Sequence, residues 1–366
     1  MIREWLSAML RGDTPECPFP DKLTHESIFD LANAEGIVGL LNERIRAAGQ
    51  SSDIPPELST ELARSARIKA QQSLMRESEC RRILSCLSDE RIDVLLLKGS
   101  ALAYWLYPSA HLRECSDIDL LFCSYADAQK AVGILQTLQY SLLDPALAGT
   151  LVSFEQTCVR NSNDNASGLE IDLHWQLSSS PVFAYRFGFD ELNASAIALP
   201  KLGSHARGLS LMHAFFNACM HRIQNMTDGT ENTLKWLYDL HLLSLEFTHA
   251  DWQSLCETAI QRKLAGTCLA GLRATQLEFN TVVPANVFDA LENAAKHEHL
   301  DVNKMHRWLY IQRMSFFAFP STQMSMRWLL QRLLPNTAYL QARYGGSNNF
   351  FSLALRRIRA GFQRLF

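Results

Sequence analysis

Two aspartates stand at alternate positions of a short apolar run, Ser116–Phe122, in which isoleucine and leucine separate Asp117 from Asp119. In a β-strand, side chains at positions i and i+2 project from the same face, so the two carboxylates would lie together. Hard divalent cations prefer carboxylate ligands, and such a pair can share two ions about 3.5–4 Å apart. The run therefore predicts a strand with a metal site on one face and core packing on the other.

A third carboxylate lies in a second alternating segment, residues 169–175. Glu170, Asp172 and His174 share one face of this predicted strand, and apolar residues form the other face. Asp172 is predicted to complete one metal site and to help deprotonate an incoming nucleophile. Glu170 is expected at the rim of the site, and His174 is expected to orient its neighbours rather than to act as a base.

A glycine-serine pair, Gly99 and Ser100, stands between a predicted strand and a predicted helix over 101–107. At such a junction, unobstructed backbone N–H groups and the positive end of the helix dipole can hold phosphate groups. The pair is therefore predicted to bind the phosphate tail of a nucleotide. Together with the acidic strand, it suits the transfer of a nucleotidyl group, which needs metal ions and a phosphate cradle.

Two basic residues flank these motifs, and each has two interpretations. Lys98 either meets a phosphate or pairs with an acidic neighbour. Arg113, four residues before Asp117, either binds the leaving pyrophosphate through a bidentate contact or forms a surface salt bridge.

The elements that must position these residues divide the chain into three predicted parts. Residues 1–90 are rich in good helix formers and are predicted to be helical. Residues 91–205 alternate short apolar strands with helices, and residues 206–366 return to a helical pattern. The expected fold class is α+β, with a small mixed sheet and its helices between largely helical N- and C-terminal regions.

Within the central part, residues 151–160 and 168–175 are predicted to pair as a hairpin across a polar loop, residues 161–167. This pairing is needed if Asp172 is to approach Asp117 and Asp119, because more than fifty residues separate them in the chain.

Several short motifs occur in one order along the chain: Lys98-Gly-Ser-Ala-Leu102, Tyr107-Pro108, Arg113, Asp117-Ile-Asp-Leu-Leu121 and Ile171-Asp-Leu-His-Trp175. In this order they resemble the bacterial, uncharacterised nucleotidyltransferase family of the DNA polymerase beta-like nucleotidyltransferase superfamily. The resemblance extends from about Ile92 to the C-terminus. One feature departs from the wider superfamily, since the sixteen residues between Ser100 and Asp117 form a longer connection than usual.

The resemblance implies a Mg²⁺-dependent enzyme that moves an NMP group from an NTP, such as ATP, to a hydroxyl or phosphate acceptor, with release of pyrophosphate. Two Mg²⁺ ions, or Mn²⁺ in their place, would be held by Asp117, Asp119 and Asp172. The acceptor is left open among a small molecule, a peptide, a protein and RNA. Two alternatives stand beside this reading: a catalytically silent nucleotide- or partner-binding protein of the same fold, and an RNA-modifying nucleotidyltransferase.

The helical part contains further polar residues that the resemblance places in a pocket wall. They are His213 on one predicted helix, and Lys235 and Asp239, four residues apart on the next. His174 is a further candidate for this wall. The alternative is that these residues form a polar seam between helices.

Composition narrows the class of protein. The formal net charge is −3, which disfavours, without excluding, a dedicated nucleic-acid binder. The nine cysteines include no Cys-x-x-Cys pair, and no apolar run is long enough for a transmembrane segment, so a cytoplasmic protein is expected. The basic stretch Phe351–Phe366 carries Arg356, Arg357, Arg359 and Arg364. It is expected either to pack its apolar face or to touch an acidic partner, a membrane surface or RNA.

Overall fold

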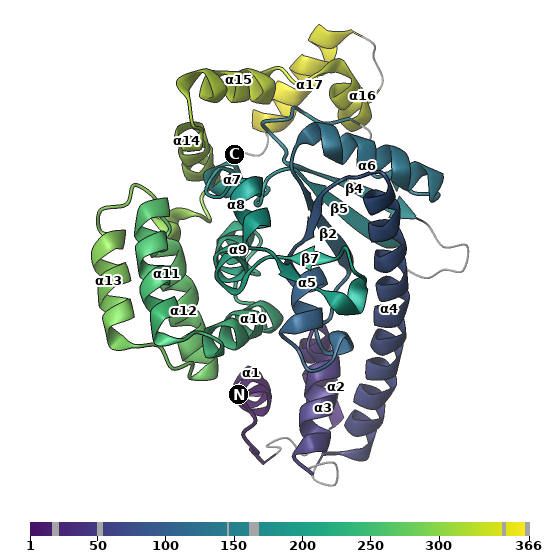
Figure 1. The fold of residues 1–366 in the computed structure, drawn as a ribbon, viewed down its shortest axis with the longest axis vertical. Coiled ribbons are helices and arrows are strands. Elements are labelled where there is room, and N and C mark those ends of the chain that lie inside the picture. The colour runs from purple at the N-terminus through teal and green to yellow at the C-terminus, as the bar shows by residue number, and fades with distance from the viewer. Residues whose placement is uncertain (17–21, 50–53, 145, 161–167, 346–348, 363–366) are drawn as a thin grey trace. The chain divides into compact units, whose positions relative to one another are not determined.

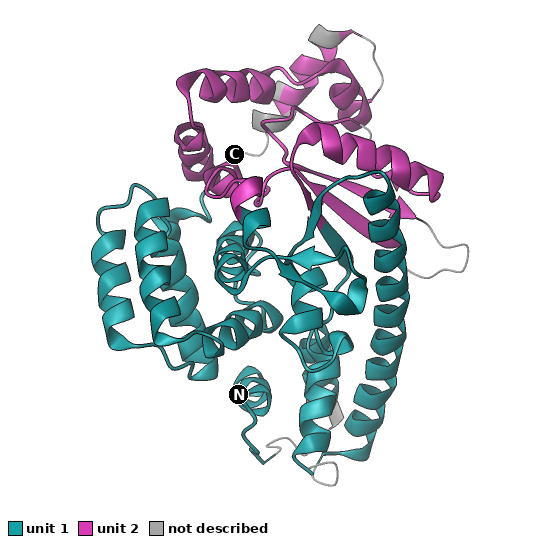
Figure 2. Cartoon of the chain, viewed as in Figure 1, with its two compact units in different colours: residues 1–119, 192–307 teal, residues 120–191, 308–366 magenta. Residues whose placement is uncertain are grey.

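A computed structural model describes residues 1–16, 22–49, 54–144, 146–160, 168–345 and 349–362 (Figure 1). Packing divides the chain into two compact units, each made of two stretches of sequence (Figure 2). Unit 1 contains residues 1–119 and 192–307, and unit 2 contains residues 120–191 and 308–366.

Unit 1 is mainly helical and begins with the helices that precede the acidic strand. Its first stretch contains α1 (Ile2–Arg11), α2 (Lys22–Ala34), α3 (Val38–Ala47), α4 (Pro56–Asp89), β1 (Val94–Leu96), α5 (Lys98–Trp105) and the start of β2 (Asp117–Phe122). Its second stretch contains the second half of α8 (Phe189–Ala194), then β6 (Ile197–Ala198), β7 (Arg207–Gly208), α9 (Leu211–Gln224), α10 (Leu234–Leu245), α11 (His249–Arg262), α12 (Ala265–Phe279) and α13 (Ala285–Ala295).

Unit 2 combines a hairpin with two groups of helices. Its first stretch contains the end of β2, α6 (Tyr125–Thr137), β3 (Ser141–Leu142), β4 (Glu155–Arg160), β5 (Leu169–His174) and α7 (Pro181–Ala184). Its second stretch contains α14 (Trp308–Ala318), α15 (Thr322–Leu333), α16 (Thr337–Tyr344) and α17 (Phe350–Phe362).

The described strands form a mixed sheet of seven strands in the order β3-β4-β5-β2-β1-β7-β6. β1 pairs with β7 in parallel, whereas β6–β7, β3–β4 and β4–β5 are antiparallel pairs. β2 has residues in both units, since the division falls between Asp119 and Leu120. The α+β class expected from the sequence is confirmed.

The predicted central strands are found at the expected places, with ends moved by a few residues. The predicted hairpin is the β4–β5 pair, in which Thr157 faces Asp172. Its loop, 161–167, lies outside the described residues. β3, β6 and β7 have no counterpart in the sequence analysis, because two residues are too few to show an alternating pattern.

Local sequence signals account for the ends of several helices. α4 begins with Pro56 at its first position, where a missing N–H costs nothing. Ser124 and Ser210 accept hydrogen bonds from first-turn N–H groups of α6 and α9, and Thr248 forms a capping box with Asp251 at the start of α11.

One apolar core in unit 1 joins the N-terminal helices to α10. α1 contributes Trp5 and Leu10, α3 contributes Leu41, and α10 contributes Leu237 and Tyr238. Tyr107 and Leu112, from the connection between α5 and β2, belong to the same core. The N-terminal helices therefore support both the segment that leads into the acidic strand and the helix that carries Lys235 and Asp239.

The expected division at residues 90 and 205 follows changes in secondary structure, whereas the compact units follow packing. The contacts join the N-terminal helices to the second stretch of unit 1 and assign 206–307 and 308–366 to different units. The expected three-part division stays a prediction about domain boundaries. None of the helices within the described residues combines the length and apolar character needed to cross a membrane.

We expect Glu35→Ala to destabilise unit 1. Its carboxylate accepts hydrogen bonds from Arg3 Nη1 and from the Leu234 N–H that begins α10, both at 2.5 Å. Loss of this cap and ion pair should lower the free energy of unfolding by about 1–2 kcal/mol. Denaturant unfolding measures the change. Glu43→Ala, an exposed position on α3, is the matched control, and equal effects of the two substitutions would contradict the assignment.

Candidate functional site

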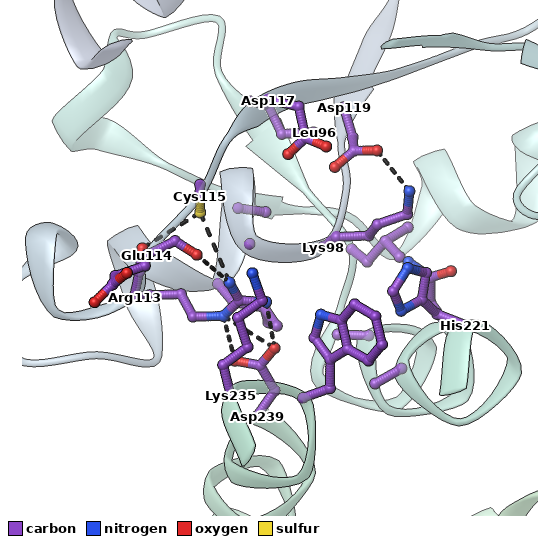
Figure 3. A pocket seen from close by; sticks show the side chains of 18 of the residues that line it. Leu96, Lys98, Arg113, Glu114, Cys115, Asp117, Asp119, His221, Lys235 and Asp239 are labelled. Atoms are coloured by element: carbon purple, nitrogen blue, oxygen red, sulfur yellow. Dashed lines mark hydrogen bonds and ion pairs between the residues drawn. The ribbon is translucent and has the colours of Figure 1, made fainter. Parts of the chain in front are cut away.

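A pocket of unit 1 gathers most of the residues singled out in the sequence (Figure 3). Its volume is about 820 Å³, counted out to the solvent at its mouth. α5 and β2 provide one side, the segment before β2 provides a second, and α9 and α10 provide the rest. Lys98, Gly99, Arg113, Asp117, Asp119, Lys235 and Asp239 all line it.

Asp117 and Asp119 lie on one side of the pocket, as Figure 3 shows. Asp119 is 2% exposed, and its Oδ1 lies 2.6 Å from Lys98 Nζ. Burial, followed by the charge of Asp119, raises the pKa of Asp117 above its usual value. Two carboxylates held together with so little solvent have an excess of negative charge that a cation would neutralise.

Lys98 therefore pairs with an acidic neighbour, which is one of its two predicted interpretations. It adopts a φ of +49°, in the left-handed region that side chains other than glycine rarely occupy. Such a conformation costs roughly 1–3 kcal/mol and tends to occur at functional sites. The ion pair with Asp119 holds the Lys98 side chain at the start of α5.

Ser100 joins α5 to the acidic strand. Its hydroxyl donates to the Asp117 carbonyl (3.2 Å) and accepts from the Asp119 N–H (3.1 Å). The hydroxyl proton is thus engaged with β2. The residue before α5, Leu97, provides no side-chain cap. An anion at this helix start would therefore contact backbone N–H groups.

A buried ion pair connects the segment before β2 with α10. Arg113 Nε and Nη2 donate to the Asp239 carboxylate at 2.7–3.0 Å, and Tyr107 Oη donates to it at 2.8 Å. Arg113 is 6% exposed and Asp239 is 4% exposed. Arg113 therefore forms a salt bridge, one of its two predicted interpretations, but the pair is enclosed and does not lie at the surface.

Gly99 is required by the close approach of Arg113. A Cβ built on Gly99 would lie 2.6 Å from Cys115 Sγ and 3.0 Å from Arg113 Nη1. No side chain fits there unless Cys115 moves and the guanidinium shifts. Gly99 thus admits the buried ion pair beneath α5, a packing role that the sequence analysis did not foresee.

Glu114 connects the pocket to the N-terminal helices. It accepts from Lys69 Nζ on α4 (2.5 Å) and from the Gly39 N–H on α3 (3.1 Å). The sequence analysis missed Glu114, because its partners lie 45 and 75 residues away and no local pattern links them.

α10 and α9 present a mixed basic and aromatic wall. Lys235 packs its stem over Gly36, which has a φ of +67° and no room for a Cβ. Burial, then the charge of Arg113, lowers the Lys235 pKa. Trp236 packs edge-on against His221, whose pKa falls to about 3, mainly through burial. His221 is therefore neutral at physiological pH.

His213 does not line this pocket among the described residues of unit 1. Its Nδ1 lies 3.0 Å from the hydroxyls of both Ser195 and Ser210 at the start of α9. Of the predicted wall, Lys235 and Asp239 line the pocket, and His213 belongs to a hydrogen-bonded helix start.

Asp172 and His174 belong to β5 of unit 2. Thr157 Oγ1 donates to Asp172 Oδ1 across the β4–β5 pair (2.6 Å), and His174 Nδ1 lies 3.2 Å from Glu155. Glu170 is exposed, and its place at the rim of the site stays a prediction. Within the described residues of unit 2, Asp172 and His174 are side chains that could act as metal ligands. The position of Asp172 beside Asp117 stays a prediction.

Comparisons with known proteins indicate the class of this fold and site. A family model of nucleotidyltransferases matches residues 21–301. The chain belongs to that family, which is described as uncharacterised nucleotidyltransferase. No curated protein matches the chain. A solved structure, JHP933 from Helicobacter pylori, is 15% identical, with 68% of this chain and 97% of that chain covered and a TM-score of 0.33.

We expect Asp239→Ala to destabilise the protein strongly, by about 3–5 kcal/mol, because it leaves the Arg113 guanidinium buried without a counter-charge. The double substitution Arg113→Met/Asp239→Leu removes both charges and should recover most of the loss. Thermal and denaturant unfolding of the wild type and both variants test this. A double variant less stable than Asp239→Ala would contradict it.

Gly99→Ala should lower stability by about 1–3 kcal/mol, since the new methyl group overlaps Arg113 and Cys115. Gly133→Ala is the matched control, because Gly133 lies in helix α6 and a Cβ there meets nothing within 4 Å. The control should be neutral or stabilising. Melting temperatures of the two variants measure the contrast, and a stable Gly99→Ala protein would show that the ion pair tolerates displacement.

Proposed function

We propose that this protein is a Mg²⁺-dependent nucleotidyltransferase that moves an NMP group from an NTP to a hydroxyl or phosphate acceptor and releases pyrophosphate. The observation that carries the proposal is the pair of carboxylates formed by half-buried Asp117 and buried Asp119, at one side of a pocket that also contains cationic and aromatic side chains. Membership of a nucleotidyltransferase family supports the same class of reaction.

The donor set fits a divalent cation. Asp117 and Asp119 offer hard oxygen ligands, and burial, followed by repulsion from Asp119, raises the pKa of Asp117. Asp172 is proposed as the third ligand and as the group that receives the acceptor proton. The order of strands, in which β5 is the neighbour of β2, supports this proposal. A bound Mg²⁺ would supply charge neutralisation for the phosphates and the leaving group.

The start of α5 is proposed to hold the β- and γ-phosphates. Support comes from the uncapped backbone at Gly99 and Ser100 and from the Lys98 ammonium beside Asp119. When a metal ion neutralises Asp119, Lys98 would be released toward the phosphate tail. Both interpretations of Lys98 would then hold at different stages of the reaction.

The wall formed by α9 and α10 suits the rest of the nucleotide. Trp105 and Trp236 line the pocket with neutral His221 and with Asn217. Indole rings offer stacking surfaces for a base, and neutral imidazole and amide groups offer hydrogen bonds. Lys235 adds a positive charge beside this wall, where it can meet an anionic part of the nucleotide or acceptor.

Arg113 is proposed to position the pocket rather than to bind pyrophosphate, because its Nε, Nη1 and Nη2 groups already donate to Asp239 and to the Glu114 carbonyl. Asp239, the partner of Arg113, is proposed to have the same positioning role. Variants at these two positions should therefore change stability more than the KM for the nucleotide.

We expect Asp117→Asn and Asp119→Asn each to reduce transfer by more than about a hundredfold, because each removes a charged metal ligand. Stability should hold or rise at Asp117, since the substitution relieves repulsion between buried like charges. Incubation of the purified protein with each α-labelled NTP, Mg²⁺ and a cell extract detects labelled acceptor and identifies it.

Asp93→Asn is the control for this experiment, because Asp93 is an exposed aspartate just before β1 and should leave transfer unchanged. Near-normal transfer by Asp117→Asn would refute the metal site. Tight binding of Mg-NTP by the wild type without release of pyrophosphate would instead favour a nucleotide-binding protein that does not turn over.

A further inference from the structure

The segment that follows the family match has an unusual charge. Residues 308–366 contain eight arginines, no lysine and no acidic residue. Since the formal net charge of the whole chain is −3, residues 1–307 carry −11. The match to the family ends at residue 301. A strongly basic segment is thus appended to an acidic protein, an asymmetry typical of proteins that contact an anionic surface.

This segment forms α14, α15, α16 and α17 of unit 2 (Figure 2). Some of its arginines have structural roles. Arg356 donates to the carbonyls of Tyr344 and Gly345 at the end of α16, and Arg357 donates to the carbonyl of Arg332 near the end of α15. Cations at helix C-termini are favourable, so part of the positive charge stabilises the fold.

Other arginines have no such role. Arg313, Arg327, Arg343 and Arg359 are exposed, and none has an acidic partner among the residues that the structure describes. Their charges remain available to an external anion.

The exposed face of α14 combines such an arginine with large apolar side chains. Leu309, Arg313 and Phe317 follow one another at intervals of four residues, so they lie along one side of the helix. Leu309 is 66% exposed and Phe317 is 70% exposed.

α15 and α17 also combine an exposed arginine with exposed apolar side chains. On α15, Met326, Leu330 and Leu333 form an exposed stripe beside Arg327. On α17, Leu355 is 70% exposed next to Arg356 and near Arg359. A helix with arginine and exposed leucine on its outer side is suited to the interface between lipid headgroups and acyl chains.

We propose that α14, α15 and α17 bind the surface of an anionic phospholipid membrane. The arginines would contact headgroup phosphates, and the apolar side chains would enter the acyl boundary without crossing the bilayer. RNA is the other polyanion of matching charge. It is disfavoured because most of the exposed apolar side chains are leucine or methionine, which cannot stack on bases as aromatic rings do.

Cosedimentation of the full-length protein with phospholipid vesicles tests the proposal without requiring turnover. Partition into vesicles of phosphatidylcholine with phosphatidylglycerol should exceed that into phosphatidylcholine alone by about tenfold or more. Raising the ionic strength from about 0.1 M to about 1 M should weaken it, because the Debye length falls from about 10 Å to about 3 Å.

Two variants separate the charge from the apolar contribution. Arg313→Glu/Arg327→Glu and Leu330→Ser/Leu333→Ser should each lower partition by about tenfold or more, with unchanged melting temperatures. Matched controls lie in unit 1: Arg67→Glu and Leu277→Ser alter exposed residues there and should leave partition unchanged.

Three results would overturn the proposal. The first is equal partition into neutral and anionic vesicles, and the second is no partition into either. The third is binding of a mixed RNA pool that depends on the same arginines, without binding of vesicles. Since none of these readouts uses nucleotidyl transfer, failure here leaves the proposed enzyme activity standing, and loss of that activity leaves this proposal standing.

Discussion

The ion pair between Arg113 and Asp239 is the interaction on which the pocket depends. It fixes α10 against the segment that leads into the acidic strand, and it does so without solvent, where an unpaired charge is very costly. Position 99 is a glycine beside this pair, because a side chain there would overlap Cys115 and crowd the guanidinium. One electrostatic contact thus sets the position of the turn that begins α5 and of the helix that carries Lys235.

Around this contact the pocket keeps its charges close to balance. Lys98 neutralises Asp119, while Asp117 retains a raised pKa that reflects burial beside a like charge. His221 is neutral because burial lowers its pKa. The remaining negative charge is concentrated where a cation would bind, which is the electrostatic preorganisation that phosphoryl transfer requires.

Much of this site was predictable, because short sequence motifs indicate its chemistry. Asp117 and Asp119 alternate with core residues, and β2 forms where that alternation lies. What the sequence could not reveal is pairing over long distances. Arg113 had two interpretations, a phosphate ligand or a salt bridge, and no local pattern indicates its partner Asp239, 126 residues away. Glu114 gave no signal at all. The short strands β6 and β7 are too brief for periodicity to show, although β7 pairs with β1 beside the acidic strand.

The division of the chain into interleaved units has a consequence for its synthesis. As the ribosome releases the protein from its N-terminus, Arg113 emerges long before Asp239, so the ion pair cannot form while residues 120–191 appear. The β4–β5 hairpin is available by then, but the helices that complete unit 2 follow only after residue 307. Synthesis of unit 2 therefore begins before synthesis of unit 1 ends. At no stage does the nascent chain contain one complete unit and no part of the other.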